Sequence, residues 1–168
     1  FIGQGCIISL ATLLGFGSAA FLLALNGNVI EVFSAFALFI VSSSLLGLSF
    51  IALAYIISLV VNEKSKAAGI ALLLWLFFVL LFDLVLLGLL VGIDNGFTQQ
   101  GLVQAMMFNP ADLFRLINLS ALHTDDVNGV LAIAINSEFN TLTLLMVMLA
   151  WIAIPLCIAQ LIFNKKSI

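Results

Sequence analysis

Asp83 is a charged residue in an otherwise apolar stretch, and it is the strongest single candidate for chemistry in this sequence. No other Asp, Glu, Lys or Arg lies between Ala67 and Ile93. A bilayer core takes about 20 apolar residues to cross, and an ionisable group in such a segment typically marks a path, a proton relay or a charge pair. No second acid lies in the stretch to continue a relay. Asp83 is therefore a candidate intramembrane functional residue. The structural alternatives are a carboxyl group that hydrogen-bonds a neighbouring helix and one that reaches the outer interface.

A second group of polar side chains lies at a predicted helix start. Asn109 is suited to cap a helix, Pro110 to occupy its first position, and Asp112 to lie near its positive end. Arg115 follows Asp112 by three residues, so the two share one face. Apolar residues at helical spacing predict a helix lying in the outer membrane interface with its apolar side down. These apolar residues are Leu113, Leu116 and Ile117. The segment is either a capped surface helix with a weak ion pair or a docking surface for an extracytoplasmic partner, formed by Asn109, Pro110, Asp112, Arg115 and Asn118.

Several side chains have metal-ligand chemistry, but none has a distinctive spacing. The candidates are His123, Asp125 and Asp126 for a divalent ion, and the pairs Met106/Met107 and Met146/Met148 for Cu(I). A solvated turn and core-filling methionines are the favoured explanations of these residues. Cys6 and Cys157 both lie in apolar runs, without a metal-ligand or disulfide pattern, and are expected to be inert filling. We predict no metal site and no cofactor.

The sequence also lacks the residues of a self-contained enzyme. It has one histidine, no nucleophile–base arrangement, no glycine-rich phosphate loop and no basic patch for nucleic acid. We therefore predict a protein that is not an enzyme, and any nucleotide hydrolysis would belong to a separate subunit.

The composition indicates that membrane-spanning helices position these groups. Hydrophobic residues make up 64% of the chain and charged residues only 8%, against about 25% charged residues in a soluble domain. Long runs without alternation mean helices, because a chain in hydrocarbon must satisfy its own backbone groups. The predicted fold is an all-α polytopic bundle that forms one transmembrane domain over residues 1–168. The predicted spans are 2–25, 33–61, 68–91 and 142–163, with an outer segment over 94–141.

Some spans should depart from straight helices. The second span is long, so it should tilt, or bend at Ser42–Ser44 and Gly47. Pro155 should kink the fourth. Val127–Ile135 is too short to span and suits a re-entrant or interfacial segment. Small residues in the spans predict close helix packing, with a path lined by Gly and Ser as the alternative.

Basic residues predict the orientation. Lys64 and Lys66 lie between the second and third spans, and Lys165 and Lys166 lie in the tail, whereas segment 94–141 holds only Arg115. Because Lys and Arg concentrate in cytoplasmic loops, both ends of the chain should be cytoplasmic. The chain begins at Phe1 without a basic leader, so we interpret it as starting inside a longer protein.

Three stretches resemble one family. They are ATLLGFGSAA, LLGLSFIALAYIISLVVNEKSKAAGIALLLWLFFVLLFDLVLLGLL and NPADLFRLINL, followed by a final span and a basic tail. They are similar to the NosY family, the permease subunits of the ABC transporter for nitrous oxide reductase maturation, within the ABC-2 permease class. The resemblance implies a bacterial inner-membrane subunit with six spans, of which this chain holds the last four.

The same resemblance implies partners and a role. A cytoplasmic ABC ATPase would contact Glu63, Lys64 and Lys66. A periplasmic copper-handling protein would dock around residues 109–118, and two copies would form a homodimer. The implied role in denitrification is ATP-driven support of copper–sulfur centre assembly, with export of a sulfur species. The alternatives are an ABC-2 exporter of lipid, drug or polysaccharide, and a membrane scaffold that does not transport.

Overall fold

Every regular element in the described part of the chain is a helix. The computed structural model describes residues 1–25, 29–92, 99–122 and 140–166. Its elements are α1 (Ile2–Ala24), α2 (Val29–Val60), α3 (Lys64–Leu76), the π-helical turn η1 (Phe77–Leu81), α4 (Phe82–Gly92), α5 (Gln99–Met106), α6 (Pro110–Leu122) and α8 (Thr141–Lys166). The predicted all-α fold with four long apolar helices is confirmed.

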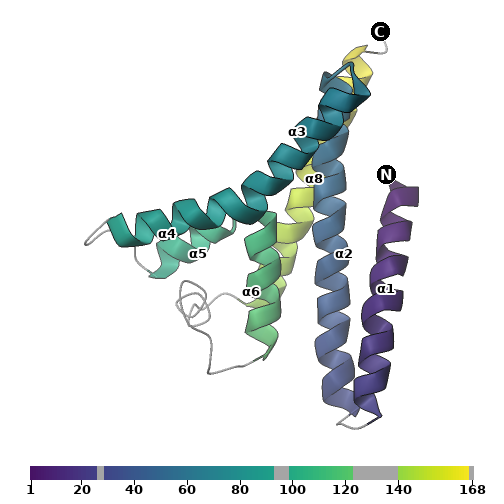
Figure 1. Cartoon of the computed structure of the whole chain (residues 1–168), viewed down its shortest axis with the longest axis vertical. Helices are drawn as coiled ribbons and strands as arrows, with labels where there is room; N and C mark the ends of the chain where they lie inside the picture. Colours follow the sequence, from purple (N-terminus) through teal and green to yellow (C-terminus); the bar gives the residue numbers. More distant parts are fainter. Residues whose placement is uncertain (26–28, 93–98, 123–139, 167–168) are drawn as a thin grey trace.

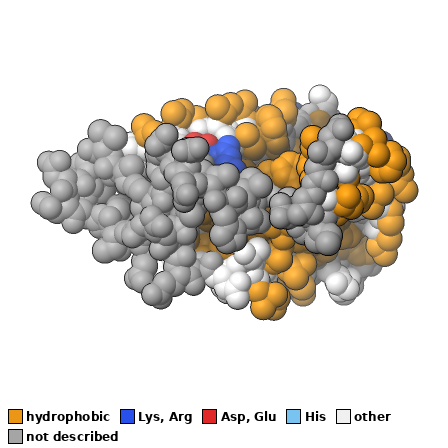
Figure 2. Space-filling view, turned by 90° about the horizontal axis from the view of Figure 1, so that it is seen from below, with side chains coloured by type: hydrophobic (Ala, Val, Ile, Leu, Met, Phe, Trp, Pro, Cys, Tyr) orange, Lys and Arg blue, Asp and Glu red, His pale blue; other side chains and the backbone are white. Residues whose placement is uncertain are grey.

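Four stretches of the described residues are long and apolar enough to cross a bilayer. They are Ile2–Ala24, Phe36–Val60, Lys64–Gly88 and Thr141–Lys165, with mean hydropathies between 2.1 and 2.9. Large apolar side chains point outward from all of them, and Figure 2 shows hydrophobic side chains over much of the described surface at one end of the molecule. This surface suits lipid rather than water. The division of the whole chain into one domain stays a prediction.

The sharp change of direction lies in the third span, not in the second. Helix α2 runs as one helix from Val29 to Val60 without a sharp bend (Figure 1). Two of its serine hydroxyl groups find hydrogen-bond partners within the helix. Ser42 donates to the carbonyl oxygen of Phe39 at 3.1 Å, and Ser49 donates to that of Leu46 at 2.7 Å. The prediction of a bend at the serine cluster is therefore wrong.

Gly47 serves packing between α1 and α2. A Cβ atom at this position would lie 2.8 Å from Cγ2 of Ile8, and a Cβ at Gly5 would lie 2.7 Å from Cδ2 of Leu48. The two helices approach closely because these residues lack side chains, which is how membrane helices pack. At these two positions, close helix packing is the role that the structure shows.

The third span bends at η1. Here the N–H of Phe82 bonds to the carbonyl of Phe77, five residues earlier, which is the wider hydrogen-bond step of a π-helix. Figure 1 shows α3 running beside the bundle and α4 leading away from it. Helix α8, in contrast, continues from Thr141 to Lys166 across Pro155, and the kink predicted there stays a prediction.

Helices α5 and α6 form a hairpin whose turn reaches the middle of the bundle. The indole Nε1 of Trp151 donates to the carbonyl of Met107 at 3.0 Å, and the amide of Asn109 donates to the carbonyl of Phe78 at 2.7 Å. Phe78 and Trp151 each lie near the middle of a candidate span. The turn between α5 and α6 is therefore at membrane depth.

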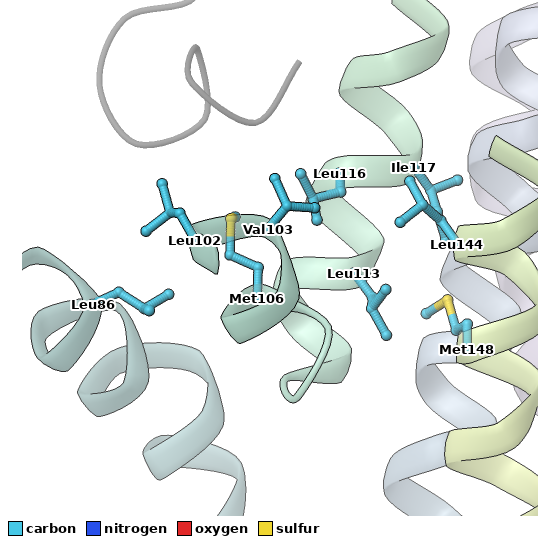
Figure 3. Packing of buried hydrophobic residues seen from close by; sticks show 9 residues of the cluster. All are labelled: Leu86, Leu102, Val103, Met106, Leu113, Leu116, Ile117, Leu144 and Met148. Carbon is cyan, nitrogen blue, oxygen red and sulfur yellow. The ribbon is translucent and has the colours of Figure 1, made fainter. Parts of the chain in front are cut away.

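The hairpin contributes most of the buried core. Buried apolar side chains from α4, α5, α6 and α8 meet there (Figure 3). They are Leu86, Leu102, Val103, Met106, Leu113, Leu116, Ile117, Leu144 and Met148. Helix α6 packs between α2 and α8. The expectation that this helix lies on the outer interface is wrong: its apolar face is covered by other helices, because the hairpin inserts into the bundle.

Candidate functional site

Asn109 caps the beginning of α6. Its Oδ1 atom accepts a hydrogen bond from the N–H of Ala111 at 2.9 Å, and Pro110 is the first residue of the helix. These are the predicted roles of an N-cap and an N1 proline. The amide nitrogen Nδ2 serves a second purpose, because it donates to the carbonyl of Phe78 at 2.7 Å and to Oδ2 of Asp112 at 2.8 Å. Asn109 thus joins the start of α6 to the π-helical turn of span three.

Arg115 joins two carboxylates. Its NH1 group donates to Oδ1 of Asp112 at 3.0 Å and also to Oδ2 of Asp83. Asp112 is buried, whereas the side chains of Arg115 and Asp83 are 33% and 39% exposed. Asp83 is thus a partnered charge, and it is also hydrogen-bonded to a neighbouring helix, which is one of the structural alternatives stated above.

This cluster carries an excess of negative charge. With both acids ionised, Asp83, Asp112 and Arg115 would sum to one negative charge. Burial, and then repulsion by Asp83, raises the pKa of Asp112 from 3.8 to about 7, although Asn109 and Arg115 act in the opposite direction. Helix α6 is not one of the four candidate spans. Near neutral pH, a proton on Asp112 would make the cluster neutral.

Asn118, which follows Asp112 and Arg115 on α6, provides another polar contact. Its Nδ2 atom donates to Oγ of Ser42 at 3.0 Å and to the carbonyl of Phe114 at 2.7 Å. A similar contact, between Oγ1 of Thr12 and Oγ of Ser44 at 3.0 Å, joins α1 to α2. Polar groups at this depth pair with each other because an unpaired one is costly away from water.

The predicted docking residues therefore point mostly inward. Asn109, Pro110 and Asp112 are buried, and Arg115 and Asn118 are half-buried. A partner that approached α6 in this conformation could not reach the three buried side chains. The docking of an extracytoplasmic partner around residues 109–118 stays a prediction.

The predicted ATPase contact is exposed. Glu63, Lys64 and Lys66 lie at the start of α3, and Lys66 and Glu63 form an exposed ion pair at 3.1 Å. Such a pair adds little stability, so these charges are free to meet another surface. Figure 1 places this end of α3 near the end of α8, where Lys165 lies. The contact with an ATPase stays a prediction.

The metal candidates are not gathered in the part of the chain that the structure describes. No group of three or more His, Cys, Asp and Glu side chains lies together among those residues. Met106 and Met148 are buried in the apolar core, whereas Met146 is exposed. Cys6 and Cys157 are free thiols at exposed positions rather than core filling. The segments His123–Asp126 and Val127–Ile135 lie outside the described residues.

Two contacts of this site were missed by reasoning from the sequence. The Asn109–Phe78 bond and the Arg115–Asp83 pair both cross about thirty residues of chain. The one available signal was that Asp83 and Arg115 are each isolated charges in apolar surroundings, since such charges tend to find each other.

The fold and the site define a polytopic helical membrane protein with internally paired charges. The chain belongs to the ABC-2 family of transporter proteins, whose family model matches residues 1–168. It is 44% identical over 170 residues to the protein of Stutzerimonas stutzeri named "Probable ABC transporter permease protein NosY". This match covers 99% of this chain and 62% of that relative. It is 43% identical over 173 residues to the Pseudomonas aeruginosa protein of the same name, covering 100% of this chain and 62% of that relative. The chain thus spans somewhat less than two thirds of each relative, and it is a NosY homologue of the non-catalytic permease class.

Proposed function

We propose that this chain is the membrane-spanning part of an ATP-driven transporter that supports assembly of the copper–sulfur centre of nitrous oxide reductase, with a sulfur species as the exported cargo. The observation that carries this proposal is the 44% identity to a NosY permease along 99% of the chain. Identity of this extent includes the spans as well as the hairpin, so the same architecture serves both proteins. The cargo is inferred from the resemblance and not from a binding site.

The energy source of this transporter would be a separate ABC ATPase in the cytoplasm. The sequence has no phosphate-binding loop of its own. The exposed charges Glu63, Lys64 and Lys66 at the start of α3 are the proposed contact. Because Lys and Arg favour the cytoplasmic side, we place this end of the bundle, and both ends of the chain, in the cytoplasm of a bacterial inner membrane.

The proposed assembly has two further partners. A second copy of the protein would complete the membrane unit, because ABC transporters work with paired membrane domains. A periplasmic copper-handling protein would bind on the outer side, at the exposed parts of the segment that contains α5 and α6. Arg115 and Asn118 are the half-buried docking candidates that such a protein could still reach.

The role in enzyme maturation is tested by removing the ATPase in a denitrifying host. We expect the permease to remain in the membrane while nitrous oxide reductase is made without its copper–sulfur centre, measured by visible absorption and sulfide content of the purified enzyme. A plasmid copy of the ATPase serves as the control. Normal maturation without the ATPase would refute the proposal.

The alternatives are separated with the purified complex in lipid nanodiscs. A transporter should couple its membrane subunit to hydrolysis, so the ATPase rate should change when the permease is present. An ATPase rate that does not depend on the permease would favour a scaffold that does not transport. A rate stimulated by a lipid, drug or polysaccharide instead of a sulfur species would favour an exporter of that cargo.

A further inference from the structure

The outer half of span three is held to the bundle by few contacts. Among the described residues, helix α6 packs extensively against α2 and α8, whereas α4 does not pack extensively against any of these three helices. Among the described side chains of α4, Leu84, Val85 and Leu87 are exposed, whereas Leu86 is buried in the core and Phe82 packs against it. Figure 1 shows α4 leading away from α2 and α8, beyond the π-helical turn. Elements with few buried contacts are those that open first.

Two polar contacts from the start of α6 reach this bend, one within it and one just beyond it. The amide of Asn109 donates to the carbonyl of Phe78, inside η1, and Arg115 pairs with Asp83, in the first turn of α4. Both contacts start from α6, which is fixed between α2 and α8. They therefore hold the bend of span three to the fixed part of the bundle.

The turn η1 is suited to act as a hinge. A π-helical turn departs from the α-helical hydrogen-bond ladder and is commonly found at functional positions. The helix before it, α3, begins at the exposed charges Lys64 and Lys66, whereas the helix after it, α4, exposes Leu84, Val85 and Leu87. A shift at the inner end of α3 would reach η1 along a continuous helix and would change the angle of α4 only if the two contacts yielded.

We propose that η1 is a hinge in span three and that Asn109 and Arg115 are positioning residues that latch the outer half of that span to α6. With the latch closed, α4 has the bent position of this structure. With the latch open, α4 and the α5 helix packed on Leu86 take a different angle to α2, and the outer face of the protein changes. This inference rests on the proposed function, since the ATPase supplies the force at the start of α3.

The variant that isolates the latch is Asn109→Ser. A serine hydroxyl still caps α6 by accepting the N–H of Ala111, but it is too short to replace the amide donor to Phe78. The matched control is Ser42→Ala, which removes the Ser42–Asn118 contact between α2 and α6 without touching span three. Asn109→Ser loses the amide donors to Phe78 and Asp112, and Ser42→Ala loses the contact with Asn118, so general loosening of α6 should affect both variants.

The measurement is the distance between spin labels on α4 and α2 by pulsed electron resonance. Labels are placed at Leu87→Cys and Val41→Cys, both exposed positions, after the exposed thiols Cys6 and Cys157 are changed to serine. The whole protein is used in its complex with the ATPase, in nanodiscs. Tryptophan fluorescence of each variant verifies that it is folded.

In the unaltered protein without nucleotide, we expect one narrow distance distribution, which shifts when ATP and vanadate trap the ATPase. Asn109→Ser should show the shifted or a broadened distribution without nucleotide, and Ser42→Ala should match the unaltered protein. An unchanged distribution in Asn109→Ser, or equal changes in both variants, would overturn the latch. Because the distances are measured without nitrous oxide reductase, failure of the latch is distinct from failure of the proposed function.

Discussion

At the scale of single residues, Arg115 brings together two carboxylates from different helices. One guanidinium contacts both Asp83 and Asp112, and Asn109 satisfies a further oxygen of Asp112. Isolated charges in the outer half of a bundle are stabilised by such pairing, since an unpaired charge there is costly. The cluster gives Asp83 a definite role in structure, as the partner that ties α4 to α6.

Replacement of Arg115 by Met should destabilise the folded protein, because two carboxylates would lose their positive partner. Breaking a fully buried pair costs about 3–5 kcal/mol. Since Arg115 and Asp83 are partly exposed and therefore screened, we expect a loss of about 2 kcal/mol. The loss is measured as a lower temperature of unfolding by tryptophan fluorescence in detergent. Arg115→Lys keeps the charge without the planar fork, so its unfolding temperature should lie between those of Arg115→Met and the unaltered protein. Equal unfolding temperatures for Arg115→Met and the unaltered protein would contradict this assignment.

The raised pKa of Asp112 predicts how stability depends on pH. Because its pKa is about 7 in the folded protein and 3.8 as a free group, the folded state binds more protons than the unfolded state between these values. The contribution of Asp112 to stability is therefore fully present below pH 4 and is lost as the pH rises through 7. Asp112→Asn should remove this part of the slope, which is measured as the difference in unfolding temperature between the two proteins from pH 5 to pH 8. A difference that does not vary with pH would contradict the raised pKa.

At the scale of elements, the short helix α6 is the least expected part of the bundle. With 13 residues it is too short to span a bilayer, and its amphipathic pattern suits either a membrane surface or a protein interior. The structure places its apolar face against α2 and α8, and its polar face against span three and Ser42. The long helices α1 and α2, in contrast, meet through small residues.

Substitution of Gly47 tests the close approach of α1 and α2. A larger side chain would displace Ile8, whose Cγ2 atom would lie 2.8 Å from a new Cβ. We expect Gly47→Val to lower stability by about 1–3 kcal/mol, as overpacking does, measured by thermal unfolding. Gly69→Val, where a new Cβ meets nothing within 4 Å, is the matched control and should have little effect. Partial rescue of Gly47→Val by Ile8→Ala would assign the loss to this contact, whereas equal losses in the two glycine variants would exclude it.

At the scale of the whole molecule, the bundle has two dissimilar ends. One end holds the exposed charges at the start of α3 together with Lys165, and toward the other end lie the last residues of α1, the first residues of α2 and the beginning of α8 (Figure 1). Charge asymmetry of this kind determines orientation during insertion. The whole bundle also presents an apolar surface that only lipid, or other membrane-spanning protein, can cover.

The orientation is tested with single cysteines in a background without Cys6 and Cys157. Asn140→Cys should react with a membrane-impermeant maleimide on intact spheroplasts, because the proposed orientation places the beginning of α8 on the outer side. Lys64→Cys should react only after the membrane is permeabilised, because the proposed orientation places the start of α3 in the cytoplasm. The permeabilised sample controls for the reactivity of both thiols. Reaction of Lys64→Cys on intact spheroplasts would show that the orientation is reversed.

The number and helical nature of the long apolar segments were predictable from the amino-acid order, as was the start of α6 at Asn109 and Pro110. These features are local, because a chain in hydrocarbon satisfies its own backbone within each segment. Three features were decided only by tertiary structure: the insertion of the α5–α6 hairpin, the pairing of Asp83 with Arg115, and the bend at η1. They depend on contacts between residues far apart in the chain, and an amphipathic pattern alone does not tell whether its apolar face meets lipid or other helices.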